Sequence, residues 1–188
     1  MGEGGFGLSD TAAAILVMGV CGVGKSTVGR TLAETIGRAF VEADDFHSSD
    51  NIETMRSGRP LDDAMRWSWL DAVAEAVAAV QSTDGGGPVV FACSALKRSY
   101  RDRLRERLGR IAIVHLTGSR EVIGRRLSAR RGHFMSPDLL QSQFGAMEEP
   151  DEAEEPCVTV DVGWTLQDLQ EFAAGYARAA APSNAAGP

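Results

Sequence analysis

A glycine-rich segment of eight residues, Gly19 to Ser26, has the spacing G-x-x-x-x-G-K-S/T of a phosphate-binding loop. Glycines at these positions let the backbone turn so that successive N–H groups face the phosphates of a nucleotide. Lys25 can reach the outer phosphates, and the hydroxyl of Ser26 can hold magnesium. The pattern predicts nucleotide-binding residues at Gly19, Val20, Cys21, Gly22, Val23, Gly24, Lys25, Ser26 and Thr27.

Carboxylates that could act on an acceptor hydroxyl follow at Glu42, Asp44 and Asp45. If these residues end a strand, side-chain alternation points Glu42 and Asp44 to the same side. Asp44 is the better candidate for a base, and a capping or turn carboxylate is the alternative. Glu42 either holds a water ligand of magnesium or simply ends the strand.

Basic and polar side chains further along could bind an anionic acceptor. His47 could hydrogen-bond a polyol or a carboxylate, or it is an ordinary polar surface residue. Arg66 is a second candidate, for which an internal ion pair with Asp62 or Asp63 is the alternative.

Lys97 is one of only two lysines in the 188 residues. Together with Ser94 it follows an expected strand, so both side chains should face the same crevice as Asp44. Its ammonium could bind an anionic substrate, or it could be the exposed start of a helix over Arg101–Leu108 whose alternating charges look like a solvated face. Cys93 is expected to be a packed thiol.

Four arginines, Arg125, Arg126, Arg130 and Arg131, end a helical pattern just before Gly132-His133-Phe134. Positive charge complements the C-terminal end of a helix, which explains some of them. The adjoining glycine predicts a segment that closes arginines over a γ-phosphate. Arg126 and Arg130 share a helix face, and we expect one of them to contact the transferred phosphate.

These side chains need a scaffold, and five apolar runs supply its strands. The runs lie at Ala13–Gly19, Ala39–Asp44, Pro88–Ser94, Ile111–Leu116 and Cys157–Asp161. Helical or mixed segments separate them, which predicts an α/β fold: a three-layer sandwich of the P-loop NTPase type, with a five-stranded parallel sheet and a helical lid. Ligands then gather beyond the carboxyl ends of the strands, where the candidate residues fall.

We expect a single domain over residues 11–178, with flexible, small-residue ends at 1–10 and 179–188. An insert at residues 46–82 should form two substrate-binding helices, and a lid should lie at about residues 130–137.

The composition limits the kinds of partner and the location that we expect for this protein. A formal charge of -7 argues against a nucleic acid bound by a broad basic surface and favours a small molecule. No apolar stretch approaches the ~20 residues of a membrane span. Three cysteines without zinc-type spacing indicate reduced thiols and a cytoplasmic protein. The acidic stretch Glu148–Glu155 looks like a solvated loop.

Together these stretches resemble the gluconokinases of the small P-loop type, within the nucleoside-monophosphate and shikimate kinase-like superfamily. The resemblance spans about residues 13–162, and unlike a P-loop alone it separates subfamilies. Its most specific parts are Asp44 to His47, Asn51-Ile52-Glu53-Thr54-Met55, Gly58, Pro60-Leu61, Arg66, Trp69-Leu70, Cys93 to Lys97, Tyr100-Arg101-Asp102, Arg130 to Phe134 and Ser142-Gln143-Phe144.

The resemblance implies transfer of the γ-phosphate of ATP to the 6-hydroxyl of D-gluconate, with Mg²⁺ and often a homodimer. Asp44 would orient or deprotonate the hydroxyl, and Arg126 with Arg130 would meet ATP. The implied catalytic residues are Lys25, Asp44, Arg126 and Arg130. The implied substrate-binding residues are Asp44, His47, Arg66, Ser94, Lys97, His133 and Gln143.

The chain departs from the usual family pattern in the substrate loop and in the P-loop. Ser48 stands where a proline often follows the histidine, Trp67-Ser68 replaces a basic-proline pair, and Cys21 and Val23 replace Ser or Gly. The nearest rival function is a shikimate kinase-like enzyme with another hydroxy acid. A GTP-driven switch is the less favoured alternative, because neither lysine lies in an Asn/Thr-Lys-x-Asp motif.

Overall fold

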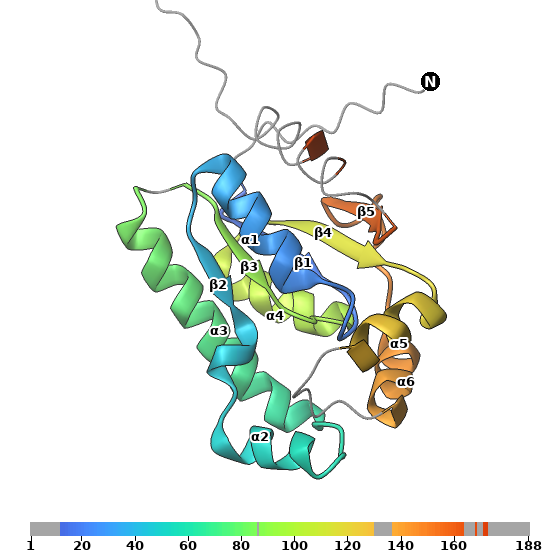
Figure 1. The fold of residues 1–188 in the computed structure, drawn as a ribbon. Coiled ribbons are helices and arrows are strands. Elements are labelled where there is room, and N and C mark those ends of the chain that lie inside the picture. The colour runs from blue at the N-terminus through green and yellow to red at the C-terminus, as the bar shows by residue number, and fades with distance from the viewer. Residues whose placement is uncertain (1–11, 86, 130–136, 164–167, 169–170, 173–188) are drawn as a thin grey trace, which may run out of the picture.

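A five-stranded sheet forms the centre of the computed structural model, which describes residues 12–85, 87–129, 137–163, 168 and 171–172. The strands are β1 (Ala14–Met18), β2 (Phe40–Glu42), β3 (Val89–Ala92), β4 (Ile111–Thr117) and β5 (Cys157–Asp161). They lie in the order β2-β3-β1-β4-β5, and each neighbouring pair is parallel (Figure 1). The predicted parallel sheet is therefore confirmed.

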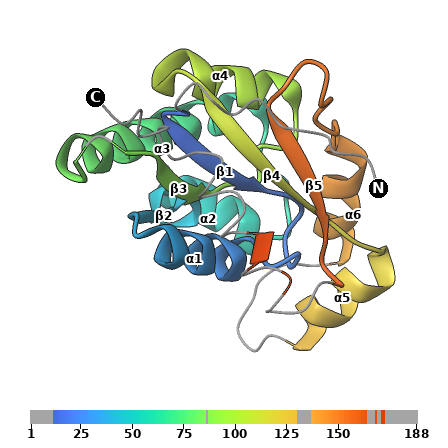
Figure 2. The same ribbon diagram turned by 90° about the horizontal axis from the view of Figure 1, so that it is seen from above.

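Helices cover both faces of this sheet. They are α1 (Lys25–Ile36), α2 (Ser49–Arg56), α3 (Asp63–Thr83), α4 (Arg98–Leu108), α5 (Arg120–Ala129) and α6 (Pro137–Ala146), with a 3-10 turn η1 (Ala43–Phe46) after β2. Helices α3 and α4 lie on one face, and α1 lies on the other (Figure 2). This is the expected three-layer sandwich. None of the helices described is long and apolar enough to cross a membrane.

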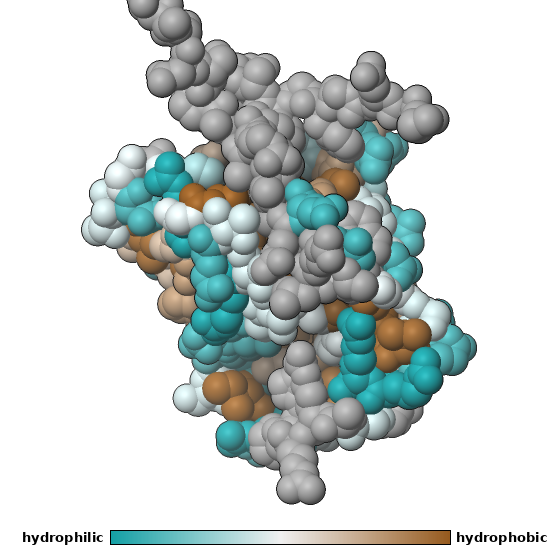
Figure 3. Space-filling view, turned by 45° about the horizontal axis from the view of Figure 1, so that its top comes forward, coloured by the Kyte–Doolittle hydropathy of each residue, from teal (hydrophilic) through white to brown (hydrophobic). Residues whose placement is uncertain are grey.

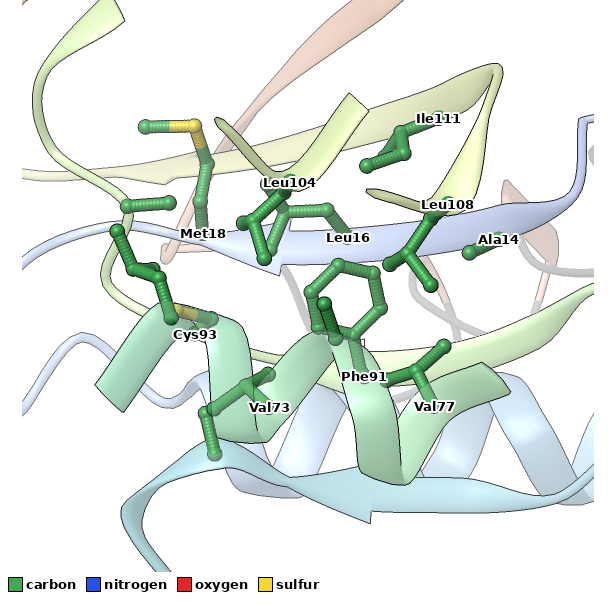
Figure 4. Packing of buried hydrophobic residues seen from close by; sticks show 14 of the residues in the cluster. Ala14, Leu16, Met18, Val73, Val77, Phe91, Cys93, Leu104, Leu108 and Ile111 are labelled. Carbon is green, nitrogen blue, oxygen red and sulfur yellow. The ribbon is translucent and has the colours of Figure 1, made fainter. Parts of the chain in front are cut away.

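Two buried apolar clusters, one on each face, hold the layers together. Strand β1 sends alternate side chains into each cluster, for example Leu16 into one and Val17 into the other. In the first cluster Leu16 and Phe91 of the sheet lie among Val73 of α3 and Leu104 of α4 (Figure 4). Because β1 is buried on both faces, all five of its residues are apolar.

The insert between β2 and β3 forms two helices, as predicted. Ser48 caps α2 by accepting a hydrogen bond from the Asn51 N–H, and Asp62 caps α3 by accepting one from the Met65 N–H. The predicted flexible ends, residues 1–10 and 179–188, and most of the predicted lid, residues 130–136, lie outside the described residues.

Strand β2 is shorter than predicted. It ends at Glu42, and the chain then enters η1, which contains Asp44. The Trp69 indole N–H donates to the Ala43 carbonyl at 2.8 Å, so that carbonyl has its partner on α3 instead of in the sheet. The expectation that Glu42 and Asp44 alternate along one strand is therefore wrong.

Two segments that looked solvated in the sequence contain buried charges. Helix α4 begins at Arg98 and not at Arg101, and the side chains of Arg101 and Glu155 are only 2% and 1% exposed. They pair with each other at 2.7 Å, and this pairing offsets the cost of removing each charge from water. The acidic stretch 148–155 is therefore not uniformly a solvated loop.

On the face seen in Figure 3, hydrophilic residues alternate with small apolar patches. Phe46 and Ile52 are the large apolar side chains that are exposed among the described residues, each to 37%. Both belong to the insert, so the apolar exposure lies near the turn that carries Asp44.

Candidate active site

The loop between β1 and α1 adopts a backbone that needs glycine. Gly24, directly before α1, has a φ of 111°, and a Cβ on Gly19 would lie 2.5 Å from the Leu116 carbonyl oxygen. The loop therefore brings its N–H groups to the positive end of α1. Lys25 Nζ lies over the same loop and donates to the Val20 carbonyl at 3.2 Å. This geometry is that of a phosphate-binding site.

Ser26 and Glu42 meet beside the P-loop lysine. Burial raises the pKa of Glu42, whereas a hydrogen bond with the Ser26 side chain and the charge of Lys25 lower it. A hydroxyl and a carboxyl are the oxygen ligands that magnesium prefers. Among the described residues no group of three or more His, Cys, Asp or Glu could hold a metal ion.

Asp44 presents an exposed carboxylate beyond the end of β2. Its side chain is 68% exposed, and its Oδ1 lies 3.8 Å from His47 Nε2. His47 stacks on Trp69 with 4.4 Å between the ring centroids, and its Nδ1 lies 3.4 Å from Asn51 Nδ2. Because the Asn51 amide nitrogen only donates, Nδ1 accepts and the ring proton sits on Nε2, on the side of Asp44. Burial lowers the pKa of His47, so the ring is neutral at neutral pH.

Lys97 and Arg66 meet at the ring of Tyr100. Lys97 Nζ donates to both carboxylate oxygens of Asp63, at 2.9 and 3.0 Å, and the Tyr100 hydroxyl donates to the same carboxylate. Arg66 Nη1 in turn donates to Tyr100 Oη at 3.1 Å. Both cations lie over the ring, at 5.3 and 5.6 Å from its centroid. Lys97 thus pairs with Asp63 directly, and Arg66 reaches the same carboxylate only through the Tyr100 hydroxyl, so two positive charges lie around one negative charge.

These contacts give Lys97 and Arg66 partners within the protein, and substrate binding by either residue stays a prediction. Lys97 precedes α4 and is held by Asp63, so it is more than a solvated helix start. Asp62 caps α3, and Arg66 donates to Tyr100 instead of pairing with Asp63. Sequence reasoning missed the roles of Asp63 and Tyr100, although Asp63 was visible as half of an acidic pair.

Ser94 and Cys93 follow β3 at the same edge of the sheet. Ser94 is half-buried. Cys93 is fully buried, and burial raises the pKa of its thiol to about 12, as expected for a packed thiol. Val17 of β1 and Glu42 of β2 both pair with Ala92 of β3, so the carboxyl ends of these three strands are close together. Directly after Ser94, Ala95 has a φ of 40°.

Two residues contributed by the α5–α6 region lie against the P-loop. Arg126 donates to the Val23 carbonyl at 3.4 Å and to the Val162 carbonyl at 2.7 Å. Gln143 of α6 accepts a hydrogen bond from the Cys21 backbone N–H at 2.7 Å, so the structure places it beside the phosphate-binding loop. The remaining candidates, Arg130 and His133, lie outside the described residues.

The fold and the site together define a class of protein. A phosphate-binding loop, an exposed carboxylate and a cationic group lie at one edge of a parallel sheet, and this arrangement is that of a P-loop kinase for a small molecule.

Comparisons with known proteins identify the family within this class. A family model described as "AAA domain" matches residues 15–143. The chain is 42% identical to a probable gluconokinase of Rattus norvegicus, over 90% of this chain and 98% of that protein. It is also 42% identical to the unliganded structure of a sugar kinase from Janibacter sp. HTCC2649, with a TM-score of 0.81 over 92% of this chain and 97% of that one.

A solved gluconokinase from Sinorhizobium meliloti 1021 is 44% identical, with a TM-score of 0.75 over 88% of this chain and 91% of that chain. The chain belongs to the gluconokinase family.

Proposed function

We propose that this protein transfers the γ-phosphate of ATP to the 6-hydroxyl of D-gluconate, giving 6-phosphogluconate and ADP. One observation supports this above the others: the P-loop, the exposed Asp44 carboxylate and the Arg66–Lys97 cationic group lie at the same edge of the sheet. A kinase for a sugar acid needs these three parts, one for the donor, one for the hydroxyl and one for the acid group.

On the donor side, the P-loop N–H groups and Lys25 would hold the phosphates of ATP. Ser26 would bind magnesium directly and Glu42 through water, and the ion would neutralise charge on the phosphates. Arg126 lies at the P-loop, where a guanidinium could stabilise charge on the transferred group, and we expect Arg130 to act beside it. Gln143, bonded to the Cys21 N–H, would steady the loop on the same side.

On the acceptor side, Asp44 would orient the 6-hydroxyl and accept its proton. Phosphoryl transfer depends mostly on positioning, so the orienting contact would act together with acceptance of the proton. The neutral His47 ring, with its Nε2 proton toward Asp44, would hydrogen-bond the polyol chain or the Asp44 carboxylate.

At the other end of the acceptor, Lys97 and Arg66 would meet the carboxylate of gluconate, with the Ser94 hydroxyl nearby. In the structure the Lys97 ammonium is already hydrogen-bonded to a carboxylate of the protein, that of Asp63. A bound acid would therefore share Lys97 with Asp63 or displace it. We expect His133 to contribute from the lid side of the site.

A coupled ADP-release assay tests the function. ATP and Mg²⁺ are held constant while D-gluconate, shikimate and related hydroxy acids are supplied one at a time. We expect turnover to depend on gluconate. Turnover with shikimate but none with gluconate would contradict the proposed acceptor, and a strong preference for GTP over ATP would contradict the proposed donor.

Location and assembly follow from the family resemblance. We expect a cytoplasmic enzyme, which agrees with the buried thiols Cys93 and Cys157. We also expect a homodimer, and light scattering after size-exclusion chromatography would measure its mass.

A further inference from the structure

Arg101 of α4 is buried, and its guanidinium joins three separate segments of the chain. Nε and Nη2 donate to the Glu155 carboxylate, with distances of 2.9 and 2.7 Å. Nη1 donates to the carbonyls of Ala95 and Leu96, at 3.3 and 3.2 Å, and to the carbonyl of Glu148 at 2.9 Å. Nε and Nη2 of Arg101 thus bind a carboxylate, and Nη1 binds the loop after β3.

The loop that Arg101 contacts has an unusual backbone. Ala95 is fully buried and has a φ of 40°, in the left-handed region that residues other than glycine rarely adopt. Such a conformation persists only when the surrounding structure determines it. The neighbours of Ala95 in this loop are Ser94 and, two residues on, Lys97, both of which are candidates for binding the acceptor.

Further hydrogen bonds tie the same loop to the segment after α6. The Glu148 N–H donates to the Leu96 carbonyl at 2.9 Å, and the Glu148 carboxylate accepts from the Arg98 N–H at 2.6 Å. Arg105 also pairs with Glu155, so the carboxylate that orients Arg101 is itself held on two sides. The loop therefore has a second anchor, and a change at Arg101 should alter its position without releasing it.

The placement of this ion pair is not explained by stability alone. A buried pair often contributes little net stability, and well-packed apolar side chains can replace it. Apolar side chains would, however, leave the Ala95 and Glu148 carbonyls without the Arg101 donor and take one of two donors from the Leu96 carbonyl. The planar fork of arginine serves the carboxylate and the carbonyls at once, which a lysine ammonium cannot do with the same geometry.

We propose that the Arg101–Glu155 pair is a positioning device for the acceptor: it holds the loop Cys93–Lys97 so that Ser94 and Lys97 face the substrate. The proposal rests on the proposed function, because it takes Ser94 and Lys97 as acceptor-binding residues. Arg101 is a positioning residue and has no contact with substrate of its own.

The test is Arg101→Lys in the full chain, with ATP and gluconate varied independently in steady-state kinetics. Lysine keeps a positive charge beside Glu155 but loses the bonds to the carbonyls. We expect the KM for gluconate to rise about 10-fold or more, while the KM for ATP stays within about 2-fold, because the P-loop is anchored elsewhere. Glu155→Gln, which keeps the shape but removes the charge, should act in the same direction.

Arg103→Lys is the matched control. Arg103 lies on the same helix and pairs with Asp71 at 2.8 Å, but it is 34% exposed and has no bond to the loop. The KM for gluconate should not change in this variant. Calorimetric titration with a non-hydrolysable ATP analogue counts the folded sites in each sample, so any loss of folded protein is corrected.

An unchanged KM for gluconate in both Arg101→Lys and Glu155→Gln would overturn the proposal. An equal loss of affinity for gluconate and ATP, or loss of ATP-analogue binding in both variants, would also overturn it, because the pair would then support the fold in general. The wild-type enzyme tests the proposed function separately: if it uses another acid, the same comparison is made with that acid.

Discussion

Asp44 combines high exposure with a fixed backbone position, so its side chain should matter for activity more than for stability. We predict that Asp44→Asn lowers kcat by ~100-fold or more, because the amide cannot accept the proton of the acceptor hydroxyl. The melting temperature should stay near that of the wild type, since the side chain is 68% exposed. Steady-state kinetics and thermal unfolding measure the two effects.

Asp45→Asn is the matched control, because Asp45 lies in the same turn and is also exposed. It should retain turnover close to that of the wild type. Near-wild-type activity in Asp44→Asn would exclude Asp44 as the base.

Lys97 is held by Asp63, but its partner is itself half-exposed, so the ammonium remains within reach of an anionic ligand. We predict that Lys97→Ala raises the KM for gluconate with little change in the KM for ATP, because it removes a contact to the acceptor only. Initial rates over a matrix of both substrates give the two constants. Arg107→Ala, which removes a charge of α4 that pairs with Asp71, is the control and should leave both constants near their wild-type values.

If the KM for gluconate were the same in Lys97→Ala and in the wild type, Lys97 would not bind the acceptor, and its role would be the ion pair with Asp63.

At the scale of the elements, α3 positions the turn that carries Asp44. The Trp69 N–H bonds the Ala43 carbonyl, and the Trp69 ring stacks on His47. We predict that Trp69→Phe costs about 1 kcal/mol of stability, because it leaves a buried carbonyl without its donor. It should also lower kcat, because η1 loses its tie to the helix. Chemical denaturation and steady-state kinetics measure both effects.

Trp67→Phe is the control on the same helix, since Trp67 contacts the ring of Tyr100 and not η1. If Trp69→Phe lost stability but kept the wild-type kcat, the helix would not position Asp44.

At the scale of the whole molecule, two buried histidines make stability depend on pH. Burial lowers the pKa of His47 and of His115 from the ordinary value of 6.5. The unfolded chain therefore binds protons that the folded chain does not, and stability is lost as pH falls below about 6.5. We predict a lower melting temperature at pH 5.5 than at pH 7.5, measured by thermal unfolding in buffers of equal ionic strength.

His115→Met tests the origin of this dependence, because Met keeps the buried position filled without a titrating group. It should reduce the difference in melting temperature between pH 5.5 and pH 7.5, whereas an unchanged difference would assign the effect to other groups.

At lower pH a second loss of stability should appear. Burial raises the pKa of Glu155, but hydrogen bonds from Arg101 and Arg105 outweigh it and lower the pKa to about 2. The stability that this carboxylate contributes is present above pH 4.5, the ordinary pKa of a glutamate, and is lost as the pH falls toward about 2.

The donor half of this protein and the layers of its fold follow from local patterns in the sequence. A P-loop is a local pattern, because its glycines and Lys25 act within one turn of chain. The strands β1, β3 and β4 were predictable for the same reason, since strands buried on both faces are continuous apolar runs. Only the ends of the strands differed, most of all where Trp69 draws Ala43 away from β2.

The pairing of the charged side chains depends on the tertiary structure. Asp63 and Lys97 are 34 residues apart, and Arg101 and Glu155 are 54 apart. In the sequence each looked like part of a helix start or a solvated face. A charged residue such as Arg101 can be buried where a partner meets it, because a counter-charge in contact offsets its desolvation. That contact depends on how α3, α4 and the loop before β5 pack together, and no local pattern encodes it.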